Sequence, residues 1–266
     1  MNPIGVVICN YNKKDFVLQC VQSVLESKEK NFDIYVVDNA SSDGSAEALK
    51  KAYGNRITVI ENKENLGGSG GFNTGLRIVR DKGYSYFMCL DDDAAVDENA
   101  LSVLYHYMEE HTDTGMAGCR VYHTQMSDYI QQSGLLIDFD NCTAKTIGAD
   151  MPEDGSLPDV IECDTVATCA VMVRADTVKQ KGVGIMPEDN FIYWDDMEWG
   201  YRIKLAGYRV VTLAEAKALH QMGANTKKEN TFINYYMWRN RTNFFMRFTP
   251  EAQMEAMSVK VLGAVF

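Results

Sequence analysis

The chain has 266 residues, 46% of them hydrophobic and 24% charged, and a formal net charge of −11. This balance is typical of a folded globular protein with a large core and excludes an intrinsically disordered chain. Broad contact with nucleic acid requires a basic surface, so the acidic charge predicts no nucleic-acid partner. An anionic ligand would need a local cation, which a bound divalent metal ion can supply.

The cysteines and the chain ends favour a cytoplasmic location. Seven cysteines form no CxxC pair and mostly lie in apolar runs, as reduced thiols of a cytosolic protein do. The first residues, MNPIGVVICNYN, lack the basic segment of a signal peptide. We also find no apolar run approaching the ~20 residues that cross a bilayer. The last residues, KVLGAVF, carry no clear stop signal, so the native chain can be longer.

Strand and helix patterns alternate over the first hundred residues. An apolar, β-branched run at 4–9 gives way to helical spacing at 14–27, and the alternation then continues. Further strands are predicted at 32–38, 56–62 and 84–90, and further helices at 45–54 and 73–82. Residues 65–75, NLGGSGGFNTG, are predicted as a glycine loop before the last of these helices. This order predicts an α/β fold with a Rossmann-like, mostly parallel sheet and helices on both faces.

The second half of the chain is less regular. Helices are predicted at 98–110, from about 194 to just before 207, and at 229–248. Strand-like runs at 166–174 and 208–213 indicate a mixed, partly antiparallel region. We expect one compact domain with lobes at 1–115 and 116–225, followed by a C-terminal helical segment at 226–266.

Polar residues gather where the predicted parallel strands end. Asn10 and Asn12 follow the first strand, Asp38 the second, Asn65 the third, and Asp91–Asp93 the fourth. Ligands of open parallel sheets bind beyond the carboxyl ends of the strands. The sequence therefore predicts a ligand site at this edge.

Three consecutive aspartates, Asp91, Asp92 and Asp93, end the fourth strand. Side chains alternate along a strand, so the first and third carboxylates can point to one side while the middle one points away. Two hard oxygen ligands suit Mg²⁺ or Mn²⁺, which complete their coordination with water and substrate phosphates. The alternative is a solvated acidic turn.

The glycine loop predicts a backbone that lies close to a phosphorylated ligand. It does not match the dinucleotide fingerprint, because GxGxxG counted from Gly68 requires glycine at Asn73, and it lacks the GK[ST] ending of a P-loop. These mismatches argue against a nicotinamide dehydrogenase and an NTPase. A flexible surface loop is the alternative. Asp38 can accept hydrogen bonds from a base or ribose, or can form an Asx turn.

A second acidic pair, Asp195 and Asp196, lies at the start of a predicted helix, where the helix dipole favours ionised carboxylates. One of them can act as a general base, and Trp194 can form an apolar wall for a sugar ring. The alternative is that both acids cap the helix while Trp194 lies in the core. His220 is one of four histidines, and a lone histidine is more often structural than a ligand.

Together these motifs resemble the inverting nucleotide-sugar glycosyltransferases of family 2, which have the GT-A fold. The matching segments occur in family order: VVICNYN, VVDNASSDGS, NLGGSGGFNTG, LDDD, WDD followed by GYRIKLAGYRV, His220, and YYMWRNRTNFF. The glycine loop, WDD and RN segments are most similar to the bacterial rhamnosyltransferase and galactofuranosyltransferase branch. The acidic pair is DD here, whereas much of the wider family has ED.

The resemblance implies metal-dependent transfer of a sugar from a UDP or dTDP donor to a glycan or lipid-linked acceptor, in cell-surface polysaccharide synthesis. Residues 1–115 would bind the donor and residues 116–225 the acceptor. Asp91, Asp93 and His220 would hold Mn²⁺ or Mg²⁺, and Asp196 would be the base, with Asp195 as second candidate. The donor would contact Asn10, Asn12, Asp38, Asn65, Gly67, Gly68, Gly71, Asp91 and Asp92, with Asp38 at the base, and the acceptor would contact Trp194.

Other interpretations stay open at this point. A sugar-phosphate nucleotidyltransferase would carry a glycine-rich, basic loop near the N-terminus, which VVICNYNKKD lacks. A non-catalytic nucleotide- or glycan-binding module is the alternative outside the enzymes. In the C-terminal segment, the basic residues Lys227, Lys228, Arg239, Arg241 and Arg247 lie close to Trp238, Phe244, Phe245 and Phe248. Such a helix can dock at the inner face of the plasma membrane or pack against the core.

Overall fold

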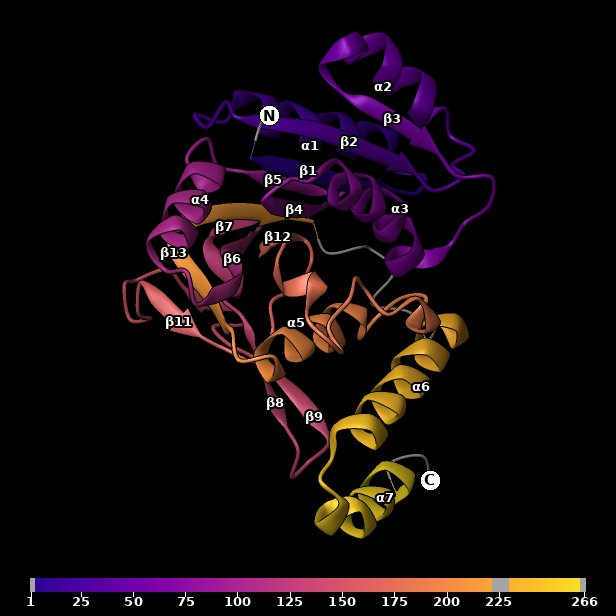
Figure 1. Ribbon diagram of the computed structural model, residues 1–266, viewed down its shortest axis with the longest axis vertical. Coiled ribbons are helices and arrows are strands. Elements are labelled where there is room, and N and C mark those ends of the chain that lie inside the picture. The colour runs from indigo at the N-terminus through magenta and orange to yellow at the C-terminus, as the bar shows by residue number, and fades with distance from the viewer. Residues whose placement is uncertain (1–2, 222–229, 264–266) are drawn as a thin grey trace.

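Four parallel strands form one half of a central sheet in the computed structural model, which describes residues 3–221 and 230–263. They lie in the order β4-β1-β2-β3 (Figure 1). Their bounds are Ile4–Asn10 (β1), Phe32–Asp38 (β2), Thr58–Glu61 (β3) and Tyr86–Asp91 (β4). Cys9 pairs with Asp91, and Asn10 pairs with Asp38. The polar strand ends therefore lie next to one another, as the sequence predicts.

The other half of the sheet is mixed. Strand β12 (Ala170–Arg174) runs antiparallel to both β4 and β6 (Thr114–His123), and β13 (Arg209–His220) runs parallel to β6. The sheet is completed by β5 (Ala94–Val96), β7 (Met126–Gln132), β10 (Met151–Pro152) and β11 (Val160–Glu162), giving an 11-stranded sheet. A separate two-stranded sheet contains β8 (Leu135–Asp138) and β9 (Thr143–Thr146). One sheet thus contains strands from both predicted lobes.

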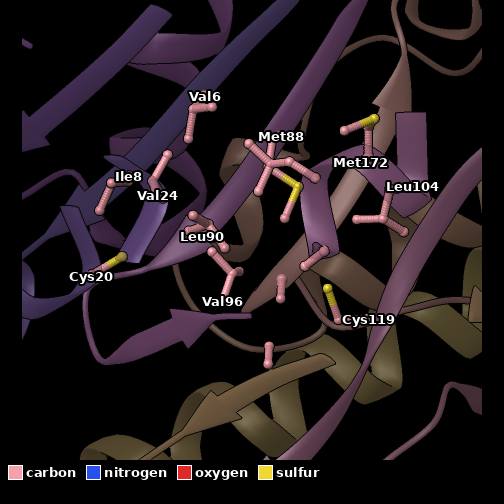
Figure 2. Packing of buried hydrophobic residues seen from close by; sticks show 14 of the residues in the cluster. Val6, Ile8, Cys20, Val24, Met88, Leu90, Val96, Leu104, Cys119 and Met172 are labelled. Atoms are coloured by element: carbon pink, nitrogen blue, oxygen red, sulfur yellow. The ribbon is translucent and has the colours of Figure 1, made fainter. Parts of the chain in front are cut away.

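Helices cover both faces of the sheet, which confirms the predicted fold class. One hydrophobic cluster packs α1 (Lys14–Glu26), α2 (Ser45–Tyr53) and α4 (Ala100–Glu110) against alternate residues of β1 and β4; Figure 2 shows part of it. The cluster on the opposite face contains α3 (Gly67–Lys82) and α5 (Asp195–Leu205). Helices α6 (Thr231–Phe248) and α7 (Met254–Gly263) follow at the C-terminal end.

The predicted glycine loop is the first part of helix α3, which begins at Gly67 and not near residue 73. The glycines let this helix lie directly on β1. A Cβ atom at Gly75 would stand 2.4 Å from Val7 Cγ1, and one at Gly71 would stand 2.4 Å from Cys9 Sγ. Glycine has low helix propensity, so local sequence favoured a loop, whereas close packing on the sheet stabilises a helix here. The alternative of a flexible surface loop is wrong.

No helix among the described residues is both long enough and apolar enough to span a bilayer.

Candidate active site

The two predicted metal-binding carboxylates and the predicted histidine meet at the edge of the sheet. Asp91 ends β4, and His220 ends β13, where it pairs with Ala94 just beyond Asp93. His220 Nε2 lies 3.2 Å from Asp93 Oδ1 and 3.7 Å from Asp91 Oδ2. An imidazole nitrogen of His220 and one carboxylate oxygen each of Asp91 and Asp93 all lie within 4.8 Å of one another. Two carboxylates and an imidazole in this arrangement can hold a divalent cation.

Asp92 is outside that group, as predicted, but it and Asp93 lie in the turn after β4 and not in the strand. Its Oδ2 accepts a hydrogen bond from the Tyr11 main-chain N–H at 3.0 Å, and its Oδ1 lies 3.0 Å from Lys13 Nζ. Lys13 Nζ also lies 2.7 Å from Asp93 Oδ2. Asp92 therefore ties the segment after β1 to the end of β4. Both oxygens are bonded within the protein, and a contact between Asp92 and the donor stays a prediction.

Negative charge is concentrated and only partly compensated around the triad. Burial raises the pKa of Asp91, and burial raises the pKa of Asp92 to about 6 even though Lys13 lies beside it. Burial acts in the same direction on Asp93, but hydrogen bonding to His220 and the charge of Lys13 bring its pKa below the usual value. Burial would lower the pKa of His220, yet Asp93 and Asp91 raise it. The surroundings thus favour positive charge at this point.

Asp195 and Asp196 are the first two residues of α5, beside the triad. Burial, and then the charge of Asp196, raise the pKa of Asp195 to about 7. Burial also raises the pKa of Asp196, against backbone hydrogen bonds from Met197 and Thr168; the bond from the Met197 N–H is 2.7 Å long. Asp195 is only 8% exposed, whereas Asp196 is partly exposed. Asp196 is therefore both oriented by main-chain groups and the more accessible of the pair.

The turn that leads into this acidic pair has an unusual backbone. Phe191, Tyr193 and Trp194 have φ angles of +64°, +64° and +65°, in the left-handed region that side chains other than glycine rarely adopt. Each such residue costs of order 1–3 kcal/mol and persists only where its surroundings fix it. The turn must therefore be held from outside.

Helix α6 holds this turn through an Arg-Asn pair. The buried Asn240 amide nitrogen lies 2.8 Å from the carbonyl oxygens of Asn190, Ile192 and Tyr193. Arg239 donates to the same Asn190 carbonyl and to one further carbonyl, that of Asp189. Sequence analysis assigned no role to this pair; its only signal was the RN segment in the family resemblance.

The first turn of α3 contacts the same turn from the other side. Gly67 has φ +75°, and a Cβ atom there would stand 2.2 Å from the Phe191 carbonyl oxygen. A Cβ atom at Gly68 would stand 3.6 Å from Asp195 Oδ2. Gly67 and Gly71 thus serve close contact between protein segments. Their contact with a donor stays a prediction.

Trp194 belongs to the hydrophobic core. It is 7% exposed, and its ring centroid lies 5.4 Å from that of Phe244 and 5.6 Å from that of Phe245. The core alternative therefore holds, and the prediction of an acceptor-facing wall at Trp194 is corrected. Packing against α6 removes the indole from solvent.

The side chains at the ends of β1 and β2 bond to one another. Asn10 Nδ2 donates to Asp38 Oδ1 at 2.9 Å and to Ser41 Oγ at 3.1 Å. Asp38 Oδ2 accepts from the Ser41 N–H at 3.1 Å, a bond to the third residue on, whereas an Asx turn bonds to the second. Asn10 Oδ1 is buried and has no hydrogen-bond partner within the described part of the chain. That oxygen lacks a partner there but has almost no exposure to solvent.

Asn12 and Asn65 brace the neighbouring loops. Asn12 Oδ1 accepts from the Ser42 N–H at 2.8 Å, and Asn12 itself has φ +55°. Asn65 Oδ1 accepts from Asn39 Nδ2 and from the Gly67 N–H, both at 2.9 Å. Both side chains are exposed at the sheet edge, and neither touches the metal triad through a described hydrogen bond.

Comparison with known proteins identifies the family. Residues 5–168 match the family model described as Glycosyl transferase family 2. The chain belongs to glycosyltransferase family 2. Its fold is GT-A: GalNAc-T7, solved with UDP, GalNAc and Mn²⁺, superimposes with a TM-score of 0.72 at 13% identity, covering 93% of this chain and 48% of that one.

Two curated bacterial relatives match part of this chain. The teichoic acid poly(glycerol phosphate) polymerase of Staphylococcus epidermidis is 26% identical over 146 residues, covering 53% of this chain and 19% of the relative. The Escherichia coli enzyme UDP-Glc:alpha-D-GlcNAc-diphosphoundecaprenol beta-1,3-glucosyltransferase WfaP is 30% identical over 109 residues, covering 41% and 42%. The chain thus spans less than half the length of either. Neither name supports the rhamnosyltransferase and galactofuranosyltransferase branch.

Helix α6 of this family 2 protein packs against the core. Arg241 donates to the Cys142 carbonyl, and Arg247 Nη1 lies 2.9 and 2.8 Å from the two carboxylate oxygens of the fully buried Glu198. Phe244 and Phe245 are fully buried. The arginines and aromatic rings that indicated a membrane helix are thus used within the protein. Lys227 and Lys228 lie outside the described residues. Sequence patterns show the partner four residues on, Arg202, but not Arg247, which is distant in sequence.

Proposed function

We propose that the chain transfers a sugar, with inversion, from a nucleoside-diphosphate donor to a hydroxyl group of a glycan or lipid-linked acceptor in cell-surface polysaccharide synthesis. The observation that carries this proposal is the meeting of Asp91, Asp93 and His220 within 4.8 Å, beside Asp195 and Asp196. The family 2 match and the named glucosyltransferase relative support it. A non-catalytic module would have no need of a second, buried acidic pair next to a cation site.

The residues present fit a divalent cation, Mn²⁺ or Mg²⁺. The donor set offers two carboxylates and an imidazole, and water and diphosphate oxygens would complete the coordination. Burial raises the pKa values of Asp91, Asp195 and Asp196, and neighbouring carboxylates add to the rise at Asp91 and Asp195. When bound, the cation would neutralise charge on the donor diphosphate and orient it.

We propose that the donor nucleotide lies along the ends of β1 and β2. There Asp38 would accept hydrogen bonds from the base or ribose, and Asn10, which donates to Asp38 Oδ1, would hold that carboxylate in place. Asn12 and Asn65 flank this position on exposed loops. UDP is the nucleotide in the GalNAc-T7 structure and in the name of the glucosyltransferase relative, which favours UDP over dTDP.

Asp196 is the proposed general base, because main-chain hydrogen bonds orient its carboxylate and it is more accessible than Asp195. It takes the proton of the acceptor hydroxyl as that oxygen attacks the anomeric carbon. The new carbon–oxygen bond forms on the face opposite the diphosphate, and the bond to the diphosphate breaks. The nucleoside diphosphate leaves with the bonding electrons, and the configuration inverts.

The pH profile should report the acidic pair, because a carboxylate base works only when ionised. The pKa of Asp195 is raised to about 7 and that of Asp196 is also raised, so the pair takes up a proton as the pH falls through about 7. At saturating Mn²⁺ we expect kcat/KM to fall below that pH and to level off above it. Asp195→Asn removes the like charge and should move the fall to lower pH. A profile that stays level far below pH 7 would contradict this assignment.

A thermal-shift screen of the whole chain with UDP, dTDP, GDP and their sugars, with and without Mn²⁺, tests the proposed donor class. We expect one nucleoside diphosphate to raise Tm only when Mn²⁺ is present, because a ligand that binds the folded state stabilises it. The matching nucleoside triphosphates are included as well. If only they raise Tm, the nucleotidyltransferase alternative is favoured. No response to any nucleotide would sink the proposal.

The sugar and the location stay predictions. Rhamnose- or galactofuranose-like donors are implied only by the resemblance of the WDD and RN segments. Docking at the inner face of the plasma membrane is still supported by the exposed side chains of Phe232, Tyr235 and Met246 on α6. We expect the chain to float with anionic liposomes, and failure of the intact chain to do so would remove this idea.

A further inference from the structure

Gln131, at the edge of the proposed cation site, forms two hydrogen bonds with His220. Its Oε1 lies 2.7 Å from His220 Nδ1, and its Nε2 donates to the main-chain carbonyl oxygen of His220 at 3.1 Å. Gln131 lies on β7 and His220 ends β13, so the two residues come from separate parts of the chain. Neither sequence analysis nor the family resemblance assigned Gln131 a role.

These two contacts decide which imidazole nitrogen carries a proton. A main-chain carbonyl oxygen only accepts hydrogen bonds, so the NH₂ group of Gln131 must face it, and Gln131 Oε1 must then face the ring. Because Oε1 also only accepts, His220 Nδ1 must carry a hydrogen. In the neutral ring the lone pair is therefore on Nε2, the nitrogen that faces Asp91 and Asp93. This is the tautomer that a metal-binding imidazole needs.

The backbone of β7 is shaped to make this contact. In the pairing with β6, Tyr122 is opposite Ile130 and Val121 is opposite Gln132, so Gln131 is the extra residue of a β-bulge. A bulge leaves one residue outside the ladder and redirects its side chain, and such features recur next to active sites. The bulge thus gives a reason for the direction of the Gln131 amide that is independent of the hydrogen bonds.

We propose that Gln131 is a positioning residue for the cation: it fixes the ring and the tautomer of His220 so that Nε2 completes the ligand set with Asp91 and Asp93. The inference rests on the proposed function, because it requires that a cation binds there. Outer partners of metal-binding histidines typically change metal affinity by about 10–100-fold when they are removed. Since Gln131 is neutral, its effect comes from orientation and not from charge.

The test measures the affinity of the whole chain for Mn²⁺ by electron paramagnetic resonance, with and without UDP. We expect Gln131→Ala to weaken Mn²⁺ binding by about 10–100-fold, and Gln131→Glu, which keeps an acceptor for Nδ1–H, to weaken it less. Gln132→Ala is the matched control, because Gln132 is the next residue on β7 and bonds to Cys169 Sγ instead. Equal affinities of the Gln131→Ala and Gln132→Ala proteins would overturn the inference while leaving the proposed function intact.

A second readout does not depend on metal. In protein labelled with ¹⁵N-histidine, the nuclear magnetic resonance signals of His220 should report a protonated Nδ1 and an unprotonated Nε2 in the neutral ring. These signals are assigned to His220 by their absence from the spectrum of the His220→Ala protein. Gln131→Ala should remove this preference while the signals of the other histidines stay in place, which shows that the fold is kept. An unchanged His220 signal in the Gln131→Ala protein would overturn the inference. Failure of the unaltered chain to bind Mn²⁺ would instead sink the cation proposal itself.

Discussion

Replacement of Asp196 by asparagine is expected to lower kcat by about 10²–10⁴-fold, the usual contribution of a general base. Asparagine keeps the size of the side chain and can still accept the hydrogen bond from the Met197 N–H, so the start of α5 should be preserved. It cannot take the proton of the acceptor hydroxyl. Product formation from donor and acceptor is the measurement, and Tm with nucleotide and Mn²⁺ shows whether donor binding is retained.

Asp195→Asn is the matched control for this prediction. The two residues are adjacent at the start of α5, but Asp195 is 8% exposed and faces the first turn of α3. We expect Asp195→Asn to keep far more activity than Asp196→Asn. The reverse order would move the base to Asp195, and unchanged turnover in both proteins would contradict a catalytic role for the pair and restore the non-catalytic module.

Replacement of Asp93 by asparagine is expected to abolish the Mn²⁺-dependent stabilisation by nucleotide. Asp93 carries the shortest contact to His220 in the triad, and the charges around it keep its pKa low, so it is the most fully ionised ligand. A ligand present at about a hundredfold above its Kd stabilises by about 2.7 kcal/mol. In a chain of this size that corresponds to a Tm increase of about 5–10 °C, which the variant should lose.

The comparison must use the difference in Tm with and without Mn²⁺. Asp93 also forms an ion pair with Lys13, so the variant changes the stability of the metal-free protein as well. Asp81→Asn is a suitable control, because Asp81 is an exposed carboxylate on α3, paired only with its neighbour Arg80 among the ion pairs described. A full Mn²⁺-dependent shift in Asp93→Asn would show that the cation binds elsewhere.

The sequence predicted most of the first, parallel half of the fold and the acidic ends of its strands. Local rules suffice there, because a buried parallel strand reads as a continuous apolar run and the carboxyl ends of such strands meet at one edge. The sequence also predicted that Asp91 and Asp93 act together, as they do with His220, although Asp92 and Asp93 lie in the turn after β4 and not in the strand. These features depend on near neighbours in the chain.

The errors arose where distant segments decide the structure. Helix α3 begins in a glycine run because β1 and the 190–194 turn lie too close to admit side chains. Trp194 is in the core because α6, some fifty residues later, covers it. The tautomer of His220 depends on Gln131, whose contact requires a bulge that no local pattern indicated. In each case tertiary packing outweighed local propensity.

Diffraction from crystals grown with Mn²⁺ and the nucleoside diphosphate that stabilises the protein tests the central claim most directly. At the manganese absorption edge, we predict an anomalous peak within bonding distance of Asp91, Asp93 and His220 Nε2, next to the diphosphate oxygens. Manganese bound elsewhere, or nucleotide bound with no peak at these three residues, would contradict the account.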